Sequence, residues 1–350
     1  MTQDPIRLGT RGSELALQQA TLVKEQLEAH RHSVELVEVT TTGDEIQDEL
    51  ISRLGKTGAF VRELDERVIN GELDAAVHSL KDMPTEMPDE LIVAAIPERT
   101  HAADVVVTPD GSSLENLPAD ATVGTGSLRR QAQLKRHRSD LTITPIRGNI
   151  DTRLVKLLAP SVQRMADERE DDDGDWKDEL TELQHRALDR SVDTHVDALV
   201  LARAGLARTG LIHQVGVADL PRDEMVPAAG QGAIALTMCD GSLAETIHQQ
   251  IDHPPSRVAV TVERTILAGL NGGCIAPIGV HAVVQGEIVR THVQVLSADG
   301  AEEIAVKREL PVERYTAAAQ ELAAELRSAG ADTLIAEAAR EASDSGGGPV

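Results

Sequence analysis

The feature that most constrains the fold of this chain is the alternation of short apolar segments with helical patterns. Apolar residues at helical spacing run from Glu14 to about His30 and again from Val61 to Asn70, where Gly71 ends the pattern. Strand-like segments precede, separate and follow them, at residues 6–9, 34–40, 75–77, 91–96 and 104–107. This alternation is typical of an α/β fold. The cores must be aliphatic, because the 350 residues include three aromatic side chains: Phe60, Trp176 and Tyr315.

A second α/β unit opens at Thr122 and includes strand-like segments at 141–146 and 198–202. The pattern changes near Pro255. A predicted helix over 257–270 is followed by three strand candidates, at residues 278–284, 288–296 and 304–310. The dipeptides Gln285-Gly286 and Asp299-Gly300 join them as hairpin turns would, and a helix over 312–329 comes next. The length and this change of pattern predict two or three domains.

The chain is strongly acidic, with 34 Lys plus Arg against 58 Asp plus Glu and a net charge of −24. This balance argues against nucleic acid as a partner, because duplex binding needs a basic surface. No apolar run reaches the roughly 18 residues of a membrane helix, and the first residues lack the pattern of a signal peptide. We therefore expect a cytoplasmic protein that does not bind membranes. Lysine accounts for only 7 of the 34 bases, and an acidic, lysine-poor surface predicts a salt-adapted source.

Charge is distributed unevenly along the chain. Residues 159–197 hold 13 acids and five bases, which predicts a solvated insertion rather than core. Residues 124–153 hold seven bases and two acids instead. Two predicted helix starts, at Ser13 and Ser127, bring free N–H groups close in sequence to arginines. For any single arginine, balancing nearby acids is the simpler explanation, but the cluster favours a pocket for a ligand with several anionic groups.

Other candidate residues remain open on the sequence alone. Asp82 follows a short buried strand and precedes Met83-Pro84, where a carboxylate serves a turn as readily as an acid–base reaction. Cys274 follows two glycines, so its sulfur is either a nucleophile or covalent anchor, or a small buried hydrophobe. Phe60, next to a glycine-rich loop, either stacks on a ligand or anchors a helix start. The cysteines have no neighbours at metal-binding spacing, so no metal site is predicted.

The motifs together resemble one family, hydroxymethylbilane synthase, also called porphobilinogen deaminase. The resemblance runs through nearly the whole chain in order. It rests on the blocks Leu8-Gly9-Thr10-Arg11-Gly12-Ser13, Val77-His78-Ser79-Leu80-Lys81-Asp82-Met83-Pro84, Val123-Gly124-Thr125-Gly126-Ser127-Leu128-Arg129-Arg130, Arg147-Gly148-Asn149, Thr152-Arg153-Leu154, Ala204-Gly205-Leu206 with Arg208, Gly230-Gln231-Gly232 and Leu270-Asn271-Gly272-Gly273-Cys274. Each block is modestly specific, and the ordered set is highly specific.

The resemblance implies three α/β domains: two lobes like those of periplasmic binding proteins and a smaller domain with a three-stranded antiparallel sheet. We assign residues 1–98 and 233–250 to lobe 1, 99–232 to lobe 2 and 251–345 to the C-terminal domain, with 346–350 as a frayed tail. The implied reaction joins four porphobilinogen molecules head to tail, releasing ammonia each time, to give linear hydroxymethylbilane. A monomer is expected.

The resemblance also implies a site. Asp82 would be the catalytic carboxylate, and a dipyrromethane cofactor would be bound to Cys274 as a thioether. Further contacts to the cofactor would come from Lys81, Asp82, Ser127, Arg129 and Arg130. Contacts to the substrate would come from Arg11, Ser13, Phe60, Thr125, Arg147, Arg153, Arg208 and Gln231.

The sequence departs from the family pattern in places. Gly126 replaces the usual serine, Gln18 replaces a frequent tryptophan, and Gly55-Lys56-Thr57-Gly58 replaces a Gly-Lys-Gly loop. The acidic segment 159–197 has no counterpart in the common pattern, and we expect it outside the cleft because it would repel an anionic substrate. The alternative is a noncatalytic two-lobed anion-binding or sensor protein, which would use the arginines but would not need Asp82 or Cys274.

Overall fold

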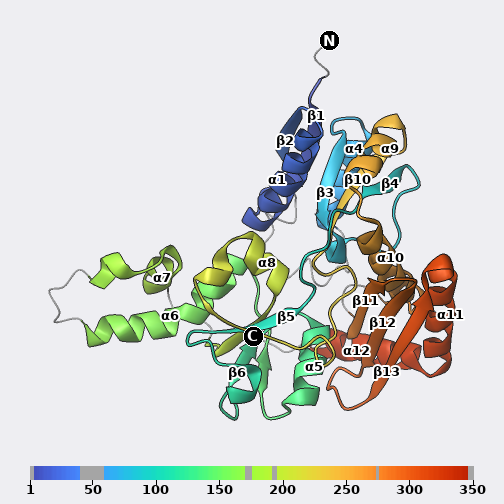
Figure 1. Cartoon of the computed structure of the whole chain (residues 1–350). Coiled ribbons are helices and arrows are strands. Elements are labelled where there is room, and N and C mark those ends of the chain that lie inside the picture. The colour runs from blue at the N-terminus through green and yellow to red at the C-terminus, as the bar shows by residue number, and fades with distance from the viewer. Residues whose placement is uncertain (1–3, 40–58, 170–175, 191–194, 273–275, 346–350) are drawn as a thin grey trace.

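The computed structural model describes residues 4–39, 59–169, 176–190, 195–272 and 276–345. Its elements form three sheets, which lie in three separate bodies (Figure 1). Two sheets have five strands each and contain both parallel and antiparallel pairs, and the third has three antiparallel strands. The predicted fold class is confirmed in this respect. Among the described residues, no helix is both long enough and apolar enough to cross a bilayer.

The sheet in lobe 1 has the order β2-β1-β3-β10-β4. Its strands are β1 (Ile6–Arg11), β2 (Val34–Val39), β3 (Ala75–Ser79), β4 (Leu91–Ala95) and β10 (Ile234–Cys239). Helices α1 (Glu14–Ala29) and α9 (Ser242–Ile251) cover one face through Val23, Leu27 and Ile247, and α4 (Ala59–Ile69) covers the other through Leu64. The sheet is therefore buried on both sides, as parallel strands require.

The sheet in lobe 2 repeats this arrangement in the order β7-β6-β8-β5-β9. Its strands are β5 (Asp104–Thr108), β6 (Thr122–Gly124), β7 (Thr142–Thr144), β8 (Ala198–Ala202) and β9 (Gly216–Asp219). The helices are α5 (Leu128–His137), α6 (Ile150–Glu168), α7 (Glu182–Leu188) and α8 (Arg203–Arg208), and the short 3₁₀ turns of the two lobes are η1 (Leu80–Asp82), η2 (Leu114–Asn116), η3 (Trp176–Glu179) and η4 (Leu211–His213).

Two connections between the lobes lie side by side. The chain leaves β4 for lobe 2 and returns from β9 to β10, and we call residues 96–103 and 228–233 the hinge. Thr100 donates its backbone N–H and its hydroxyl to the Gly232 carbonyl, and Arg99 donates from Nε to the Gln231 carbonyl. Gly232 has φ +84°, and a Cβ there would lie 2.8 Å from the His101 carbonyl oxygen. The close approach of the two segments thus depends on a glycine.

The C-terminal domain confirms the predicted hairpins. Strands β11 (Ile278–Gln285), β12 (Ile288–Leu296) and β13 (Glu303–Pro311) pair in sequence order, with φ above zero at Gly286 and Gly300 in the turns. Helix α10 (Pro254–Gly269) precedes them, and η5 (Val312–Arg314) with α11 (Tyr315–Ser328) follows. A last helix, α12 (Ala331–Ser345), was not predicted as a separate element.

The prediction for residues 159–197 is wrong in part. Ala159 and Val162 of α6, and Leu183 and Ala187 of α7, are buried in the same apolar cluster as β5 and β8. Of the segment's 13 acids, α6 holds Asp167 and Glu168 at its C-terminal end and α7 holds Glu182. Most of the negative charge therefore lies outside the two helices, and the charge count hid their buried residues. The far ends of α6 and α7 project away from the rest of the molecule, at the left of Figure 1.

Candidate active site

A cavity of about 270 Å³ lies where the two lobes face each other. Its walls come from the start of α1, the end of β3 with η1, the starts of α5 and α6, and α8. Seven residues predicted for the site line it: Arg11, Ser13, Lys81, Asp82, Arg130, Arg153 and Arg208. Tertiary structure therefore brings together residues that lie up to 197 positions apart in the sequence.

The candidate catalytic carboxylate, Asp82, lies in lobe 1 just after β3, a strand whose end is held by buried hydrogen bonds. His78 of β3 is buried, and its Nε2 lies 3.0 Å from Asp65 Oδ1 and 3.1 Å from Thr237 Oγ1. The chain then turns through η1, where Lys81 is half-buried and Asp82 is exposed to the cavity. The His78 ring is held by two buried partners, so His78 packs beneath the turn and does not line the cavity.

The start of α1 forms the neighbouring wall. The Ser13 hydroxyl accepts a hydrogen bond from the Ala16 N–H, so Ser13 is the N-cap that the sequence predicts. One turn further, the side chains of Gln19 and Ser79 form reciprocal hydrogen bonds of 2.8 and 3.0 Å. Both residues line the cavity. This pair joins α1 to β3 immediately before the Lys81-Asp82 turn.

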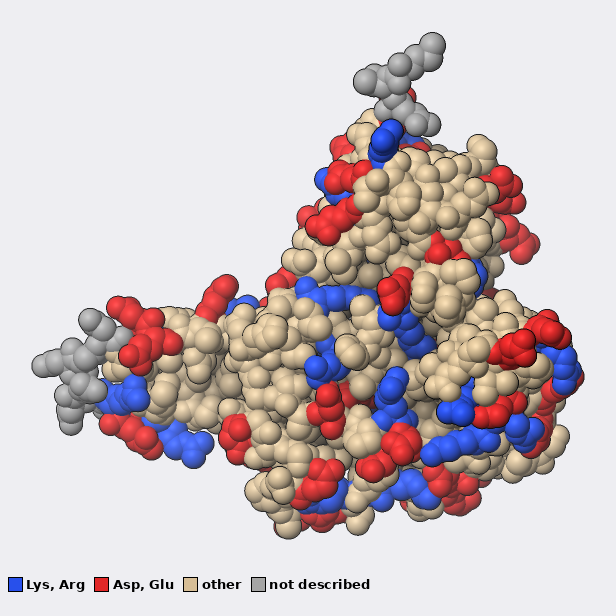
Figure 2. All heavy atoms as spheres, viewed as in Figure 1, with Lys and Arg blue, Asp and Glu red and all other residues tan. Residues whose placement is uncertain are grey.

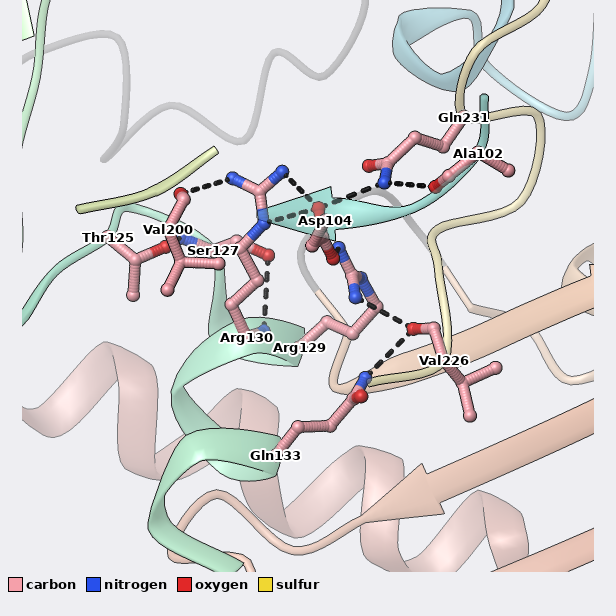
Figure 3. A network of polar contacts seen from close by, with 10 residues as sticks. All are labelled: Ala102, Asp104, Thr125, Ser127, Arg129, Arg130, Gln133, Val200, Val226 and Gln231. Atoms are coloured by element: carbon pink, nitrogen blue, oxygen red, sulfur yellow. Dashed lines mark hydrogen bonds and ion pairs between the residues drawn. The ribbon is translucent and has the colours of Figure 1, made fainter. Parts of the chain in front are cut away.

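The start of α5 is anchored by a buried ion-pair network (Figure 3). Asp104, at the first position of β5, is fully buried and faces two guanidinium groups. Arg129 donates from Nη2 to Oδ2 at 2.7 Å, and Arg130 donates from Nη2 to Oδ1 at 2.7 Å. Gln231 of the hinge also donates to Oδ1, at 2.9 Å. Burial alone would raise the pKa of Asp104, but the two arginines outweigh it and hold that pKa well below its usual range.

Two arginines of lobe 2 complete the cationic wall. Arg153 of α6 donates from Nε to the Gly148 carbonyl at 2.8 Å. Arg208 of α8 donates from Nη2 to the Gly232 carbonyl at 2.8 Å and to Thr100 Oγ1 at 3.2 Å. Arg208 therefore touches both segments of the hinge while it lines the cavity.

The electrostatics of the cavity favour an anionic ligand. Its lining holds five cations and three acids, and one of those acids, Asp151, is paired with Arg186 at 2.7 Å. Burial lowers the pKa of Lys81 even though the charge of Asp82 raises it. Burial also lowers the pKa of Arg153, and it lowers the pKa of Arg208 to about 10. Cations that are desolvated without full compensation gain from a bound carboxylate.

Several predicted residues lie elsewhere. Arg129 and Gln231 do not line the cavity, and both instead donate hydrogen bonds to Asp104. Thr125 is buried and its hydroxyl accepts from the Ser127 N–H, while Ser127 caps α5. Arg147 is exposed outside the lining. Cys274, Lys56 and the side chain of Phe60 lie outside the described residues.

Sequence reasoning missed Asp104 and Gln19. Asp104 begins an apolar strand, and a carboxylate at that position of a buried strand was a signal that it faces a cation. Gln19 lies four residues after Leu15 and therefore on the same face of α1, and both residues line the cavity. The predicted placement of segment 159–197 away from the cleft agrees with the cavity for residues 159–169, 176–190 and 195–197, none of which lines it.

Comparisons with known proteins agree with this site. The family model for the porphobilinogen deaminase dipyrromethane cofactor binding domain matches residues 6–166 and 175–245. The model for the porphobilinogen deaminase C-terminal domain matches residues 258–328. The first match leaves out only residues 167–174 of the acidic segment, so the expectation that all of 159–197 lacks a family counterpart is wrong.

Curated relatives cover nearly the whole chain. A probable porphobilinogen deaminase of Halobacterium salinarum is 48% identical over 98% of this chain and 100% of that protein. The porphobilinogen deaminase of Desulforudis audaxviator is 38% identical over 94% of this chain and 96% of its own.

Solved structures show weaker likeness. Ligand-free YehZ of Escherichia coli is 12% identical with a TM-score of 0.37, over 71% of this chain and 85% of that chain. The methionine-binding protein MetQ is 12% identical with a TM-score of 0.37, over 70% of this chain and 88% of that chain. These low scores carry no part of the assignment, which rests on the family models and the relatives. The chain therefore belongs to the porphobilinogen deaminase family of transferases, the hydroxymethylbilane synthases.

Proposed function

We propose that Asp82 is the catalytic carboxylate of the reaction that this family performs. As a hydroxymethylbilane synthase, the chain joins four porphobilinogen molecules head to tail and releases ammonia at each step to give linear hydroxymethylbilane. The observation that supports Asp82 is its position: an exposed carboxylate on the wall of a cavity lined by five cations. Of the other two acids in the lining, Asp151 is already held by Arg186.

The chemistry needs one negative group near the reacting ring. When ammonia leaves with the electrons of the C–N bond, the remaining methylene-pyrrole carries positive charge, which a fixed carboxylate stabilises. When the new C–C bond forms, the pyrrole carbon that bonds to the methylene group loses its proton, and the same carboxylate can accept it. Lys81, the neighbour of Asp82, can donate to a substrate carboxylate while its own charge is only partly compensated.

The cations of the cavity would hold the acetate and propionate groups. Arg11, Arg153 and Arg208 come from three different helices or strands, so they can meet carboxylates on different sides of a pyrrole ring. Arg130 is oriented by Asp104, which fixes its guanidinium before any ligand arrives. We assign Ser13 to the same task and propose Thr125, Arg147, Gln231 and Phe60 as further contacts of the substrate.

The residues present fit the dipyrromethane cofactor. The donor set is rich in buried or half-buried cations, as a group with several carboxylates requires. We propose that Cys274 holds the cofactor as a thioether and that Lys81, Asp82, Ser127, Arg129 and Arg130 surround it. When bound, the cofactor supplies the pyrrole that primes chain growth. The residues of this chain fix its carboxylates and so give the proximity that the condensation needs.

The test of Asp82 is Asp82→Asn compared with Asp151→Asn, a second carboxylate of the same cavity. We expect Asp82→Asn to reduce turnover of porphobilinogen by at least about 10²-fold, in the range expected for loss of a general acid–base group, while intact mass shows the cofactor still attached. Asp151→Asn should retain most of the activity. Near-normal turnover of Asp82→Asn would contradict its catalytic role.

Intact mass spectrometry tests the anchor. The purified chain should carry a two-pyrrole adduct on Cys274, Cys274→Ala should fold without it, and Cys239→Ala should keep it. If the adduct is missing even after incubation with porphobilinogen, the proposed attachment fails.

We further propose that the protein is a cytoplasmic monomer that does not bind nucleic acid, from a salt-adapted source. Among the described residues, Leu22 is the one exposed large hydrophobic side chain, which supports a monomer. Among the described residues, Cys239 is a free cysteine. Light scattering across a salt series checks the mass. A dimer at every salt concentration would contradict this proposal.

A further inference from the structure

A second cavity, of about 870 Å³, lies between the C-terminal sheet and lobe 2. One wall is the face of β11–β13, and the opposite wall comes from Asp219 at the end of β9, from the segment 220–223 that follows it and from hinge residues 101–103. None of the described residues lines both this cavity and the active-site cavity. Figure 2 shows Lys and Arg side chains gathered along this junction, on a chain whose net charge is −24.

The sheet wall carries a row of basic side chains. His281 of β11 is directly opposite His292 of β12, and His292 is directly opposite Lys307 of β13. Opposed residues of neighbouring strands project from the same face, so all three side chains enter the cavity. Basic groups opposed in this way disfavour one another's charge and weaken a sheet. The pKa of His292 is lowered by burial and by the charge of Lys307, although Asp223 and Glu303 oppose this shift.

Most of the remaining charged side chains of the cavity form ion pairs, and among the described residues Asp223 is the one acid of the lining that does not. Arg203 pairs with Asp219, Arg290 with Glu309 and Arg308 with Glu325. Within the described residues, neither Arg222 nor Lys307 has an ion pair. Arg222 reaches from lobe 2 to the basic row, and its Nη1 donates to His281 Nε2 at 3.2 Å. A guanidinium that donates to a histidine rather than to an acid remains a strong anion donor.

The same histidine adjoins the hinge. His281 Nδ1 lies 3.4 Å from Oε1 of Glu263, a fully buried carboxylate of α10. Glu263 also accepts hydrogen bonds from Arg99 and from the Gly230 N–H, which belong to the two hinge segments. An occupant of the cavity would contact Arg222 of lobe 2 and His281 of the C-terminal sheet, and His281 in turn adjoins the buried carboxylate that fastens the hinge.

We propose that this cavity binds a small polyanion with several carboxylate or phosphate oxygens, held by Arg222 from lobe 2 and by His292 and Lys307 of the sheet. The site goes beyond the condensation reaction, because it shares no residue with the active-site cavity. Its volume is within the range of small-molecule sites. A bound anion neutralises the basic row and links lobe 2 to the C-terminal domain.

The test uses the full-length holoenzyme with two probes, citrate and inorganic pyrophosphate, titrated calorimetrically at constant ionic strength. We expect the parent protein to bind at least one probe at this cavity in addition to any binding at the active site. The double variant Arg222→Ala/Lys307→Ala should weaken that binding by about tenfold or more, because it removes two charged donors. When no anion is added, the double variant should turn over porphobilinogen at the same rate as the parent.

Arg314→Ala is the matched control, since Arg314 is an exposed arginine of the same domain paired with Glu321. It should bind both probes as the parent does. Preference for citrate identifies a carboxylate ligand, and preference for pyrophosphate a phosphate ligand. Equal binding of both probes by the parent and the double variant, or no binding by the parent, overturns the proposal. Equal weakening by Arg314→Ala also overturns it, because the loss would then reflect general surface charge.

Discussion

Replacing Asp104 with asparagine removes the negative charge that faces two buried arginines. The carboxylate accepts from Arg129 Nη2 at 2.7 Å, from Arg130 Nη2 and Nε at 2.7 and 3.1 Å, and from Gln231 Nε2 at 2.9 Å. The side chains of Arg129 and Arg130 are only 4% and 8% exposed. In the variant, these cations cannot move into water without breaking the start of α5.

The size of the effect follows from this burial. Removing one partner of a buried ion pair costs about 3–5 kcal/mol, because the other charge is left uncompensated. Asparagine keeps one acceptor oxygen for part of the network, so we expect the free energy of unfolding of lobe 2 to fall by about 3–5 kcal/mol rather than more.

The pH dependence of the free energy of unfolding provides a second test of the Asp104 network. The pKa of Asp104 is lower in the folded chain than in the unfolded one. Its contribution is therefore complete above the ordinary value of 3.8 and is lost as the pH falls toward the folded pKa. Asp104→Asn has no such charge to lose, so its free energy of unfolding should not show this decrease at low pH.

The assay is a urea titration at constant salt, followed by circular dichroism and by the fluorescence of Trp176. Trp176 is the single tryptophan and is buried in lobe 2 beside α6 and α7. The control is Asp140→Asn, which removes an exposed carboxylate paired with Arg138 at 2.7 Å and should change little. If Asp104→Asn unfolds at the same urea concentration as Asp140→Asn, the network does not hold α5 and the reasoning is refuted.

Three further predictions follow from the site and the fold. Burial lowers the pKa of Lys81, so the parent's KM for porphobilinogen should rise as the pH increases from 7 toward the ordinary lysine pKa of 10.5. Lys81→Arg should abolish this rise, because arginine stays charged. A rise in Lys81→Arg identical to that of the parent would exclude Lys81 as its source. Gly232→Ala should destabilise the hinge by about 1–3 kcal/mol in the same urea assay, since φ is +84° and the new Cβ would meet the His101 carbonyl; an unchanged midpoint would show that the hinge is loose. Leu183→Ala should destabilise lobe 2 by about 2–5 kcal/mol, because it truncates a buried side chain; an unchanged urea midpoint would restore segment 159–197 as a wholly solvated insertion. Deletion of residues 167–174 should spare turnover, and lost turnover would show that these residues are needed for activity.

Local patterns in the sequence predicted much of the fold. The three strands of the C-terminal domain and their turns at Gly286 and Gly300 were found because alternation and turn chemistry act between near neighbours. The Ser13 cap was found for the same reason. Segment 159–197 misled the prediction because a net charge does not show where along a segment the acids lie or which of its other residues are buried.

In the arginine-rich stretch 124–153, arginines that are close in the sequence do not all reach the same site. Arg129 and Arg136 lie about two turns apart on one face of α5, yet Arg129 pairs with Asp104 while Arg136 pairs with Glu303 of the C-terminal domain. Of the arginines in that stretch, Arg130 and Arg153 line the active-site cavity.

The sequence by itself determined the family and the chemical types needed at the site, because the ordered motifs carry both. It also determined the helices and strands whose signals are local. Only the tertiary structure decided which charges meet. Asp104 faces its arginines because β5 is inserted between β8 and β9, and the basic row of the second cavity exists because strand register aligns residues 281, 292 and 307. Such contacts join distant parts of the chain, and their energies depend on burial, which no local pattern specifies.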